Sequence, residues 1–155
     1  MTKTDPSPPH AEPSAGWLDG VTYVFPLRVY YEDTDFSGVV YHASYLRFLE
    51  RGRSEFLRSI GLGHDSMLKA AEPLTWTVRR IAIHYEKPAR IEEALQVRTA
   101  VAEITGSRMR LRQNIMRGAT LLVKADLEVC LITLEGRPRR IPDAVRNKME
   151  RFLGE

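Results

Sequence analysis

Two aspartates, Asp33 and Asp35, stand two residues apart in the acidic segment 31–42. Carboxylates this close repel one another, so the pair calls for an explanation. Gly38 follows them and would let a ligand approach the backbone closely. The residues from Tyr41 onward predict a helix, whose first N–H groups are free to bind an oxyanion. A carboxylate beside such a helix start is sufficient for transfer of an acyl group to water. The alternative is that the aspartates cap the helix or form a turn.

The common signatures of other catalytic sites are absent from the sequence. It contains no G-x-S-x-G, no H-E-x-x-H and no G-x-x-x-x-G-K-[ST]. Residues 61–66 begin like a dinucleotide-binding fingerprint, but they follow a predicted helix and lack the third glycine. The segment around Asp35 is therefore the strongest candidate for a site.

Two predicted elements flank this segment and would position it. Residues 23–31 are rich in β-branched and aromatic side chains, which predicts a strand. From Tyr41 to Ile60, apolar residues recur at helical spacing, which predicts one long amphipathic helix. We expect Gly61 to end this helix in a left-handed conformation, and Gly52 to let it approach a sheet closely.

Four strand patterns follow the helix, over residues 74–85, 95–104, 108–115 and 121–134. The apolar phase of the first shifts near Arg79 and Arg80, which predicts a β-bulge. A weak pattern predicts a short helix at 66–71, and a final helix is expected with Pro142 near its start. The fold class is therefore α+β, a mostly antiparallel sheet wrapped around one long central helix. Pairing of chains into a homodimer or homotetramer would cover the open sheet edges.

Residues 29–46 read Val-Tyr-Tyr-Glu-Asp-Thr-Asp-Phe-Ser-Gly-Val-Val-Tyr-His-Ala-Ser-Tyr-Leu. This stretch resembles the signature of the YbgC-type branch of the 4-hydroxybenzoyl-CoA thioesterase (hotdog) family. The likeness continues through residues 49–53 and 84–90 and covers about residues 24 to 150. The resemblance implies a hotdog fold and the hydrolysis of acyl-CoA thioesters to free acid and CoA, with no metal or organic cofactor. It also implies a site shared between subunits and an association with the Tol-Pal system.

The same resemblance assigns roles to individual residues. It implies that Asp35 is the catalytic carboxylate, acting as nucleophile or as the base that activates water. The main-chain N–H of His42 would face the thioester carbonyl. The His42 imidazole suits proton transfer near neutral pH, although a surface or capping histidine is the alternative. Near Asp35 and His42 in the sequence, the residues expected to contact the substrate are Gly38, Val39 and Tyr41.

Arginines alternate with apolar residues at positions 108, 110 and 112, which places three guanidinium groups on one face of a strand. A solvated face is the simpler interpretation. The functional interpretation is that Arg108 and Arg110 recognise CoA phosphates together with Arg79 and Arg80. Lys87 and Arg90 are further candidates for the same contact.

Composition bounds the class of protein. The 155 residues suit one domain, and 43% hydrophobic with 28% charged residues is typical of a globular protein. Residues 1–20, rich in proline, are expected to form a disordered tail before a single domain at 21–155. The tail carries Lys3 and three acidic residues, so its formal charge is −2. Because the net charge of the whole chain is +3, the predicted domain carries +5. The lone Cys130 excludes an internal disulfide, and the absence of an apolar leader predicts a cytoplasmic location.

Other functions stay open on the sequence alone. A hotdog hydratase would carry a different histidine signature, which is absent here. Hydrolysis of 1,4-dihydroxy-2-naphthoyl-CoA would be the same chemistry on an aromatic acyl group. A non-catalytic module that binds an acyl carrier protein or an envelope partner would use the basic face. Binding of nucleic acid is disfavoured, because the arginines are not interleaved with exposed aromatic residues.

Overall fold

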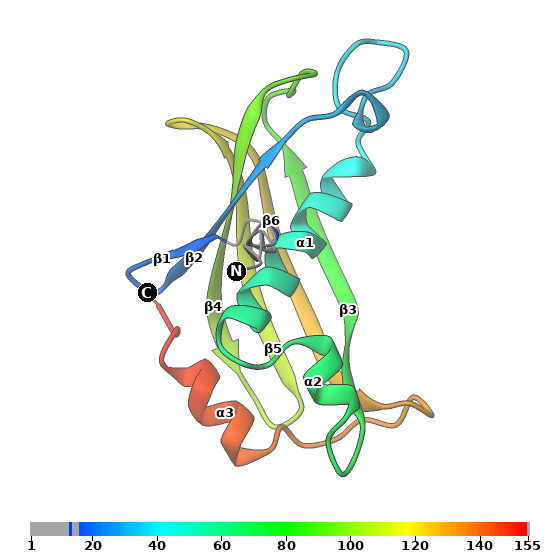
Figure 1. Ribbon diagram of the computed structural model, residues 1–155, viewed down its shortest axis with the longest axis vertical. Coiled ribbons are helices and arrows are strands. Elements are labelled where there is room, and N and C mark those ends of the chain that lie inside the picture. The colour runs from blue at the N-terminus through cyan, green and yellow to red at the C-terminus, as the bar shows by residue number, and fades with distance from the viewer. Residues whose placement is uncertain (1–12, 14–15, 155) are drawn as a thin grey trace, which may run out of the picture.

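A single antiparallel sheet and one long helix dominate the molecule (Figure 1). The computed structural model describes residue 13 and residues 16–154. The sheet has the strand order β1-β2-β4-β5-β6-β3, and all neighbouring strands pair antiparallel. The strands are β1 (Trp17–Asp19), β2 (Thr22–Arg28), β3 (Leu74–Tyr85), β4 (Ala94–Ile104), β5 (Arg108–Arg117) and β6 (Thr120–Thr133). The helices are a 3-10 turn, η1 (Tyr31–Asp33), and α1 (Ser44–Ser59), α2 (His64–Leu68) and α3 (Asp143–Glu150).

Helix α1 lies across one face of the sheet because its apolar stripe meets the inward residues of the strands (Figure 1). Burial alternates along β4 and β5, as expected for strands with one face covered. Gly52 is buried at the contact, where a Cβ would lie 2.6 Å from Cγ1 of Val97. The predicted close approach of helix and sheet is therefore confirmed, as is the α+β architecture.

The end of α1 also follows the prediction. Gly61 has a φ of +76°, in the left-handed region that favours glycine. The N–H of Gly61 donates to the carbonyl of Arg58, and the N–H of Leu62 donates to the carbonyl of Leu57. This pair of bonds is a Schellman motif, which satisfies two carbonyls at the helix end.

The start of α1 and the end of the preceding strand differ from the sequence-based expectation. Strand β2 ends at Arg28 rather than at Tyr31, because the carboxylate of Asp33 accepts a bond from the N–H of Tyr30 and a 3-10 turn follows. Helix α1 begins at Ser44 rather than near Tyr41 or His42, since the N–H of Ser44 closes a turn onto the carbonyl of Tyr41. The predicted short helix at 66–71 lies earlier, at 64–68.

The β-bulge predicted near Arg79 and Arg80 is confirmed by a register shift between Val78 and Arg80 in the pairing of β3 with β6. Strand β3 pairs with β6 on one side only and forms an edge of the sheet. The other edge is the three-residue strand β1.

Strand β1 lies within residues 1–20, which the sequence predicts as a tail. Trp17–Asp19 pair with Thr22–Val24 of β2, so these residues belong to the sheet and the predicted boundary at residue 20 is too late. Residues 1–12 and 14–15 of the expected tail lie outside the described residues. Within the described part of the chain, no helix is long and apolar enough to cross a membrane.

Candidate active site

Asp35 lies in a tight loop that is closed by one isolated antiparallel β-bridge. Thr34 and Val40 form a bridge, and the N–H of Asp35 donates to the carbonyl of Val39 at 3.0 Å. The N–H of Gly38 donates to the carbonyl of Asp35, also at 3.0 Å, and this bond closes the turn. Gly38 has a φ of +81°, so the turn itself requires a glycine at this position.

The Asp35 carboxylate is fixed by Ser37 and exposed to solvent. Its Oδ1 accepts bonds from the Ser37 hydroxyl and from the Ser37 N–H, the latter at 2.8 Å. These two bonds hold the pKa of Asp35 below its usual range, and the electrostatic effect of His42 acts in the same direction. Among the described residues nothing donates to Oδ2, so one oxygen of an ionised carboxylate is left for chemistry.

Asp33 has a different environment from Asp35. It is buried, and its Oδ2 accepts the N–H of Tyr30 at 2.8 Å. The sequence left capping and catalysis open for both aspartates. The structure gives Asp33 a capping contact and leaves Asp35 on the surface.

His42 lies two residues before the first residue of α1. Its main-chain N–H donates to no group within the described part of the chain. Its carbonyl accepts a 3.0 Å bond from the hydroxyl of Tyr85, at the end of β3. The His42 ring lies 4.5 Å from the ring of Tyr41 and 6.4 Å from that of Tyr85, measured between centroids. His42 is thus an exposed residue whose N–H has no acceptor among the described residues.

A groove of about 270 Å³ opens at His42. It is lined by Val40, His42, Tyr45, Tyr85, Glu86, Lys87 and Pro88. The hydroxyl of Tyr45 accepts the N–H of Ala89, which ties the first turn of α1 to the segment after β3. Neither Tyr45 nor Tyr85 is recognisable in the sequence as a residue of the site, because each occupies an apolar position of a helix or strand pattern.

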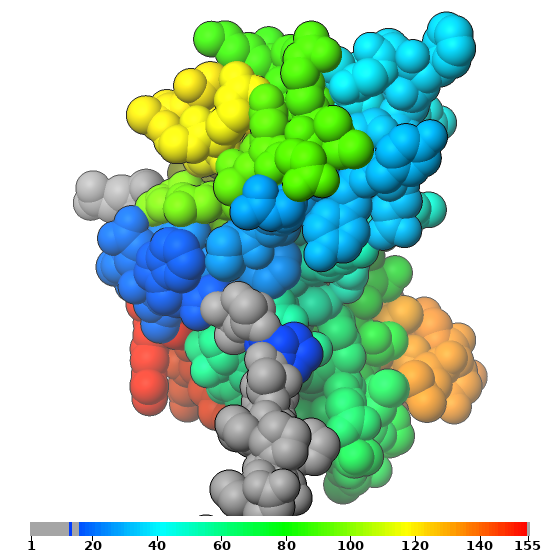
Figure 2. All heavy atoms as spheres, turned by 45° about the horizontal axis from the view of Figure 1, so that its top comes forward, coloured from blue at the N-terminus to red at the C-terminus, as the bar shows by residue number. Residues whose placement is uncertain are grey.

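The expected substrate-contacting residues lie around the same loop. Gly38 is exposed, Val39 forms a bridge with Arg90, and Tyr41 is 46% exposed. In Figure 2 the segment around residues 35–45, in blue to cyan, projects beside the green segment near residue 90. Phe36 is fully exposed at the tip of this loop, an unusual position for a phenylalanine.

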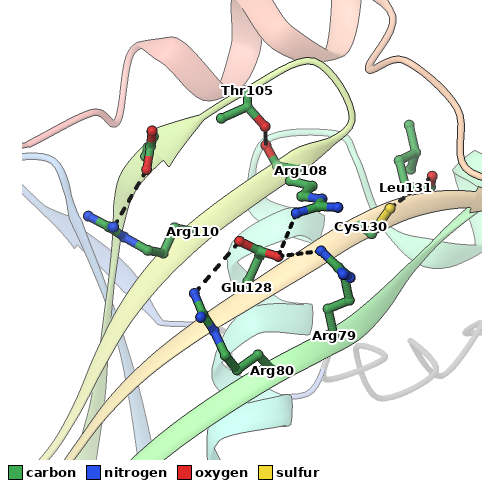
Figure 3. Close-up of polar contacts among 9 residues, drawn as sticks. Arg79, Arg80, Thr105, Arg108, Arg110, Glu128, Cys130 and Leu131 are labelled. Atoms are coloured by element: carbon green, nitrogen blue, oxygen red, sulfur yellow. Dashed lines mark hydrogen bonds and ion pairs between the residues drawn. The ribbon is translucent and has the colours of Figure 1, made fainter.

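The predicted phosphate-binding arginines form a separate cluster on the sheet face opposite α1 (Figure 3). Glu128 of β6 pairs with Arg79 at 3.2 Å, Arg80 at 3.9 Å and Arg108 at 3.5 Å, while Arg110 pairs with Glu103 at 3.5 Å. Arg80 and Tyr85 are five residues apart, or about 16 Å along β3. Of the cations singled out in the sequence, the structure brings Lys87 to the His42 groove.

No group of three or more His, Cys, Asp or Glu residues in the described ranges lies close enough to hold a metal ion.

A family model described as "Thioesterase-like superfamily" matches residues 29–149. The chain belongs to this superfamily. The acyl-CoA thioesterase YbgC of Haemophilus influenzae is 39% identical over 125 residues, which cover 80% of this chain and 91% of that protein. The acyl-CoA thioester hydrolase YbgC of Escherichia coli O157:H7 is 39% identical over 130 residues, 83% of this chain and 96% of that protein. The predicted YbgC-type family is confirmed.

Solved structures agree with the fold of this thioesterase. A probable thioesterase from Bartonella henselae is 45% identical and superimposes with a TM-score of 0.76, covering 78% of this chain and 99% of that chain. The dynemicin thioesterase is 23% identical with a TM-score of 0.77, over 86% and 99% of the two chains, and shows the fold alone. The predicted hotdog fold is therefore confirmed.

Proposed function

We propose that this thioesterase hydrolyses acyl-CoA thioesters to a free acid and CoA, with Asp35 as the catalytic carboxylate. The observation that carries the proposal is an exposed Asp35 carboxylate with one oxygen that no described residue bonds, in the same loop segment as a His42 N–H that donates to no described group. The YbgC relatives, named as acyl-CoA thioesterases, supply the substrate class.

Two routes lead from this arrangement to the same products. In one, Asp35 removes a proton from water, the water oxygen bonds to the thioester carbon and the C–S bond breaks. In the other, Asp35 Oδ2 bonds to the carbon, CoA thiolate leaves, and water hydrolyses the resulting anhydride. In both, the N–H of His42 donates to the oxyanion, and the imidazole of His42 delivers a proton to the departing sulfur.

We further propose that the active unit is a homodimer or homotetramer in which two copies pair through β3. This strand is 12 residues long, twisted at its bulge and unpaired along one edge, and such an edge invites a second strand. Antiparallel pairing about a two-fold axis brings Tyr85 of one copy toward Leu74 of the other. The surface that carries Asp35 and Phe36 would then be covered by the second subunit.

The CoA portion of the substrate needs cationic partners. Gly38, Val39 and Tyr41 would contact the thioester end, and Lys87 lies in the groove of His42. The phosphates at the other end of CoA would lie farther from the groove of His42. They would suit the arginine cluster formed by Arg79, Arg80, Arg108 and Arg110.

A thioester on an acyl carrier protein is the alternative substrate. Three arginines surround the single carboxylate of Glu128, so the outer face of the sheet carries surplus positive charge. Such a face suits an acidic carrier or an envelope partner such as the Tol-Pal system.

A panel of acyl-CoA thioesters, assayed by detection of free thiol, tests the proposal. We expect turnover with at least one chain length. Tight binding of carrier protein with no turnover of any acyl-CoA would contradict the proposal and favour a binding module.

A further inference from the structure

A groove of about 570 Å³ lies at the end of the sheet where β3 begins. It shares no lining residue with the groove of His42. Much of its lining is apolar or small, and includes Leu62, Met67, Ala70, Ala71, Leu74 and Val145. Because a cavity of about 150 Å³ holds a benzene molecule, this groove has room for an aromatic side chain.

The rim of this groove carries surplus positive charge. Arg139, Arg140 and Lys148 line it together with one carboxylate, that of Glu72. Arg139 pairs with Glu72 at 2.8 Å. Within the described ranges, no acidic side chain pairs with Arg140 or Lys148. Two unpaired cations beside an apolar floor favour an occupant that combines an apolar group with negative charge.

The catalytic loop, residues 29–42, has the complementary character. It contains three carboxylates and no lysine or arginine. One of them, Glu32, is exposed and makes no ion pair with any residue that the structure describes. Exposed aromatic rings gather on the same loop: Tyr30 is 60% exposed, Tyr31 is 84% exposed and Phe36 is fully exposed. A group of exposed apolar rings marks an interaction surface.

The proposed pairing of β3 brings this loop to the groove of a second copy. The loop is held just past the end of β3, because the N–H of Val40 donates to the carbonyl of Ala89 at 2.8 Å. The groove is lined by Leu74, the first residue of β3, and by residues 70–72 just before it. In Figure 1 the loop lies beyond one end of β3 and α2 lies beside the other.

Two-fold symmetry then sets which parts of the two copies meet. In an antiparallel pair of identical strands, residues past the end of one strand face residues before the start of the other. The loop of each copy therefore faces the groove of its partner. This step rests on the proposed function, which places the second copy at β3.

We propose that the catalytic loop of one subunit docks in this groove of the other. The ring of Phe36 packs on the apolar floor. The carboxylate of Glu32 faces the cations of Arg140 and Lys148. Because Asp35 directly precedes Phe36, the docked ring also fixes the backbone that carries the catalytic carboxylate. Arg140 and Lys148 are then positioning residues for the site of the opposite subunit.

Charge reversal on either side of the contact tests the docking. Glu32→Arg changes the loop, and the double variant Arg140→Glu, Lys148→Glu changes the groove. Each places like charges together, so each should raise the Kd of the dimer by about tenfold or more, with a matching loss of kcat. Sedimentation velocity without substrate measures the first effect, and hydrolysis of an acyl-CoA measures the second.

Mixing the two charge-reversed proteins is the decisive measurement. In a mixed dimer the reversed loop meets the reversed groove, and the unchanged loop meets the unchanged groove. Dimerisation and kcat should therefore return to within about threefold of wild type, although each protein alone is impaired. Arg151→Glu is the matched control, since Arg151 is an exposed cation three residues after Lys148 and outside the groove. It should dimerise as wild type does.

Phe36→Ser tests the apolar half of the contact. The ring is fully exposed in a single subunit, so its loss should leave the subunit folded by circular dichroism. If the ring is buried against the partner, the Kd of the dimer should rise by about tenfold or more, as for a central aromatic contact of an interface.

The outcomes separate this inference from the proposed function. An unchanged Kd in all three variants would overturn the docking and leave both hydrolysis and the pairing of β3 intact. Impaired variants that stay impaired on mixing would overturn it as well. A wild-type monomer would refute the pairing and the docking together. Rescue on mixing in a protein that hydrolyses no acyl-CoA would support the docking and refute the proposed function alone.

Discussion

The hydroxyl of Tyr85 donates a 3.0 Å hydrogen bond to the carbonyl of His42. The two residues are 43 positions apart, and the bond joins the end of β3 to the turn before α1. It fixes the peptide group that follows His42, and so limits the rotation of the His42 backbone and its free N–H. In the proposed reaction this N–H must point at the position where negative charge develops on the thioester oxygen.

Tyr85→Phe tests this positioning role. The aromatic ring is kept, so its packing against Tyr45 at 5.6 Å between centroids should persist. Loss of one hydrogen bond of about 1 kcal/mol should lower kcat by roughly three- to tenfold, with little change in KM. Steady-state kinetics measure the effect. Tyr31→Phe, which removes the hydroxyl of an 84% exposed ring, is the control and should keep wild-type kcat. A change in KM alone for Tyr85→Phe would argue against positioning.

Asp35→Asn tests the catalytic assignment. The substitution keeps the size of the side chain and an acceptor for Ser37, but removes the charge that attacks the thioester or deprotonates water. We expect kcat to fall by about 10²-fold or more with the fold intact by circular dichroism. Asp33→Asn is the control, because an amide oxygen can still accept the N–H of Tyr30. Wild-type turnover in Asp35→Asn, or inactivity in Asp33→Asn alone, would disprove the role of Asp35.

Ser37→Ala tests the cause of the lowered pKa of Asp35. The reaction needs the ionised carboxylate, so activity is lost as pH falls through this pKa. Removing the hydroxyl bond raises the pKa toward about 4, its ordinary value. The acid limb of kcat/KM should therefore move to higher pH in Ser37→Ala. Ser107→Ala, beside the start of β5 at the other end of the sheet, should leave the profile unchanged. An acid limb that stays in place would show that Ser37 does not set this pKa.

Most of the fold could be predicted because periodicity reports burial directly. The alternation along 121–134 predicted β6, and the change of phase near Arg79 predicted the bulge of β3. Periodicity does not predict local hydrogen bonds in the same way. The contact from Asp33 to the N–H of Tyr30 ends the first strand early, and a composition pattern cannot show which of two neighbouring aspartates makes it.

The candidate site was predicted only in its local part. Asp35, Gly38 and His42 are close in sequence, so the loop could be identified from one segment. Tyr85 and Tyr45 reach the site through tertiary packing, and their aromatic rings fit the strand and helix patterns equally well.

Gly61→Ala tests the C-terminal cap of α1. A Cβ at a φ of +76° is strained and should cost about 1 kcal/mol of the free energy of unfolding. Gly63→Ala is the matched control, since φ is negative there and a Cβ would make only ordinary contacts, 3.7 Å from the nearest atom. Urea unfolding at equal protein concentration measures both. Equal losses in the two variants would show that the left-handed conformation at Gly61 is unimportant.

Gln113→Leu tests a buried polar contact between α1 and the sheet. Gln113 is fully buried on the inner face of β5, at a position where the alternation calls for an apolar residue. Its Nε2 donates to the carbonyl of Leu49 at 3.0 Å and to Oγ1 of Thr99 at 2.9 Å, and its Oε1 accepts a bond from Arg53 at 3.0 Å. Leucine has a similar size but leaves these groups without their partner. We expect a loss of about 1–3 kcal/mol in the free energy of unfolding.

The control for this last prediction is Asn114→Leu, the adjacent amide on the same strand. Asn114 points to the opposite face of β5 and is partly exposed, so its replacement buries no unpaired group. Its stability should stay within about 0.5 kcal/mol of wild type. Partial burial of Arg53 lowers the pKa of its guanidinium, so losing its acceptor in Gln113→Leu leaves part of the desolvation cost of that charge unmatched. If Gln113→Leu unfolds at the same urea concentration as Asn114→Leu, the amide contacts contribute no net stability, and apolar packing alone holds α1 on the sheet.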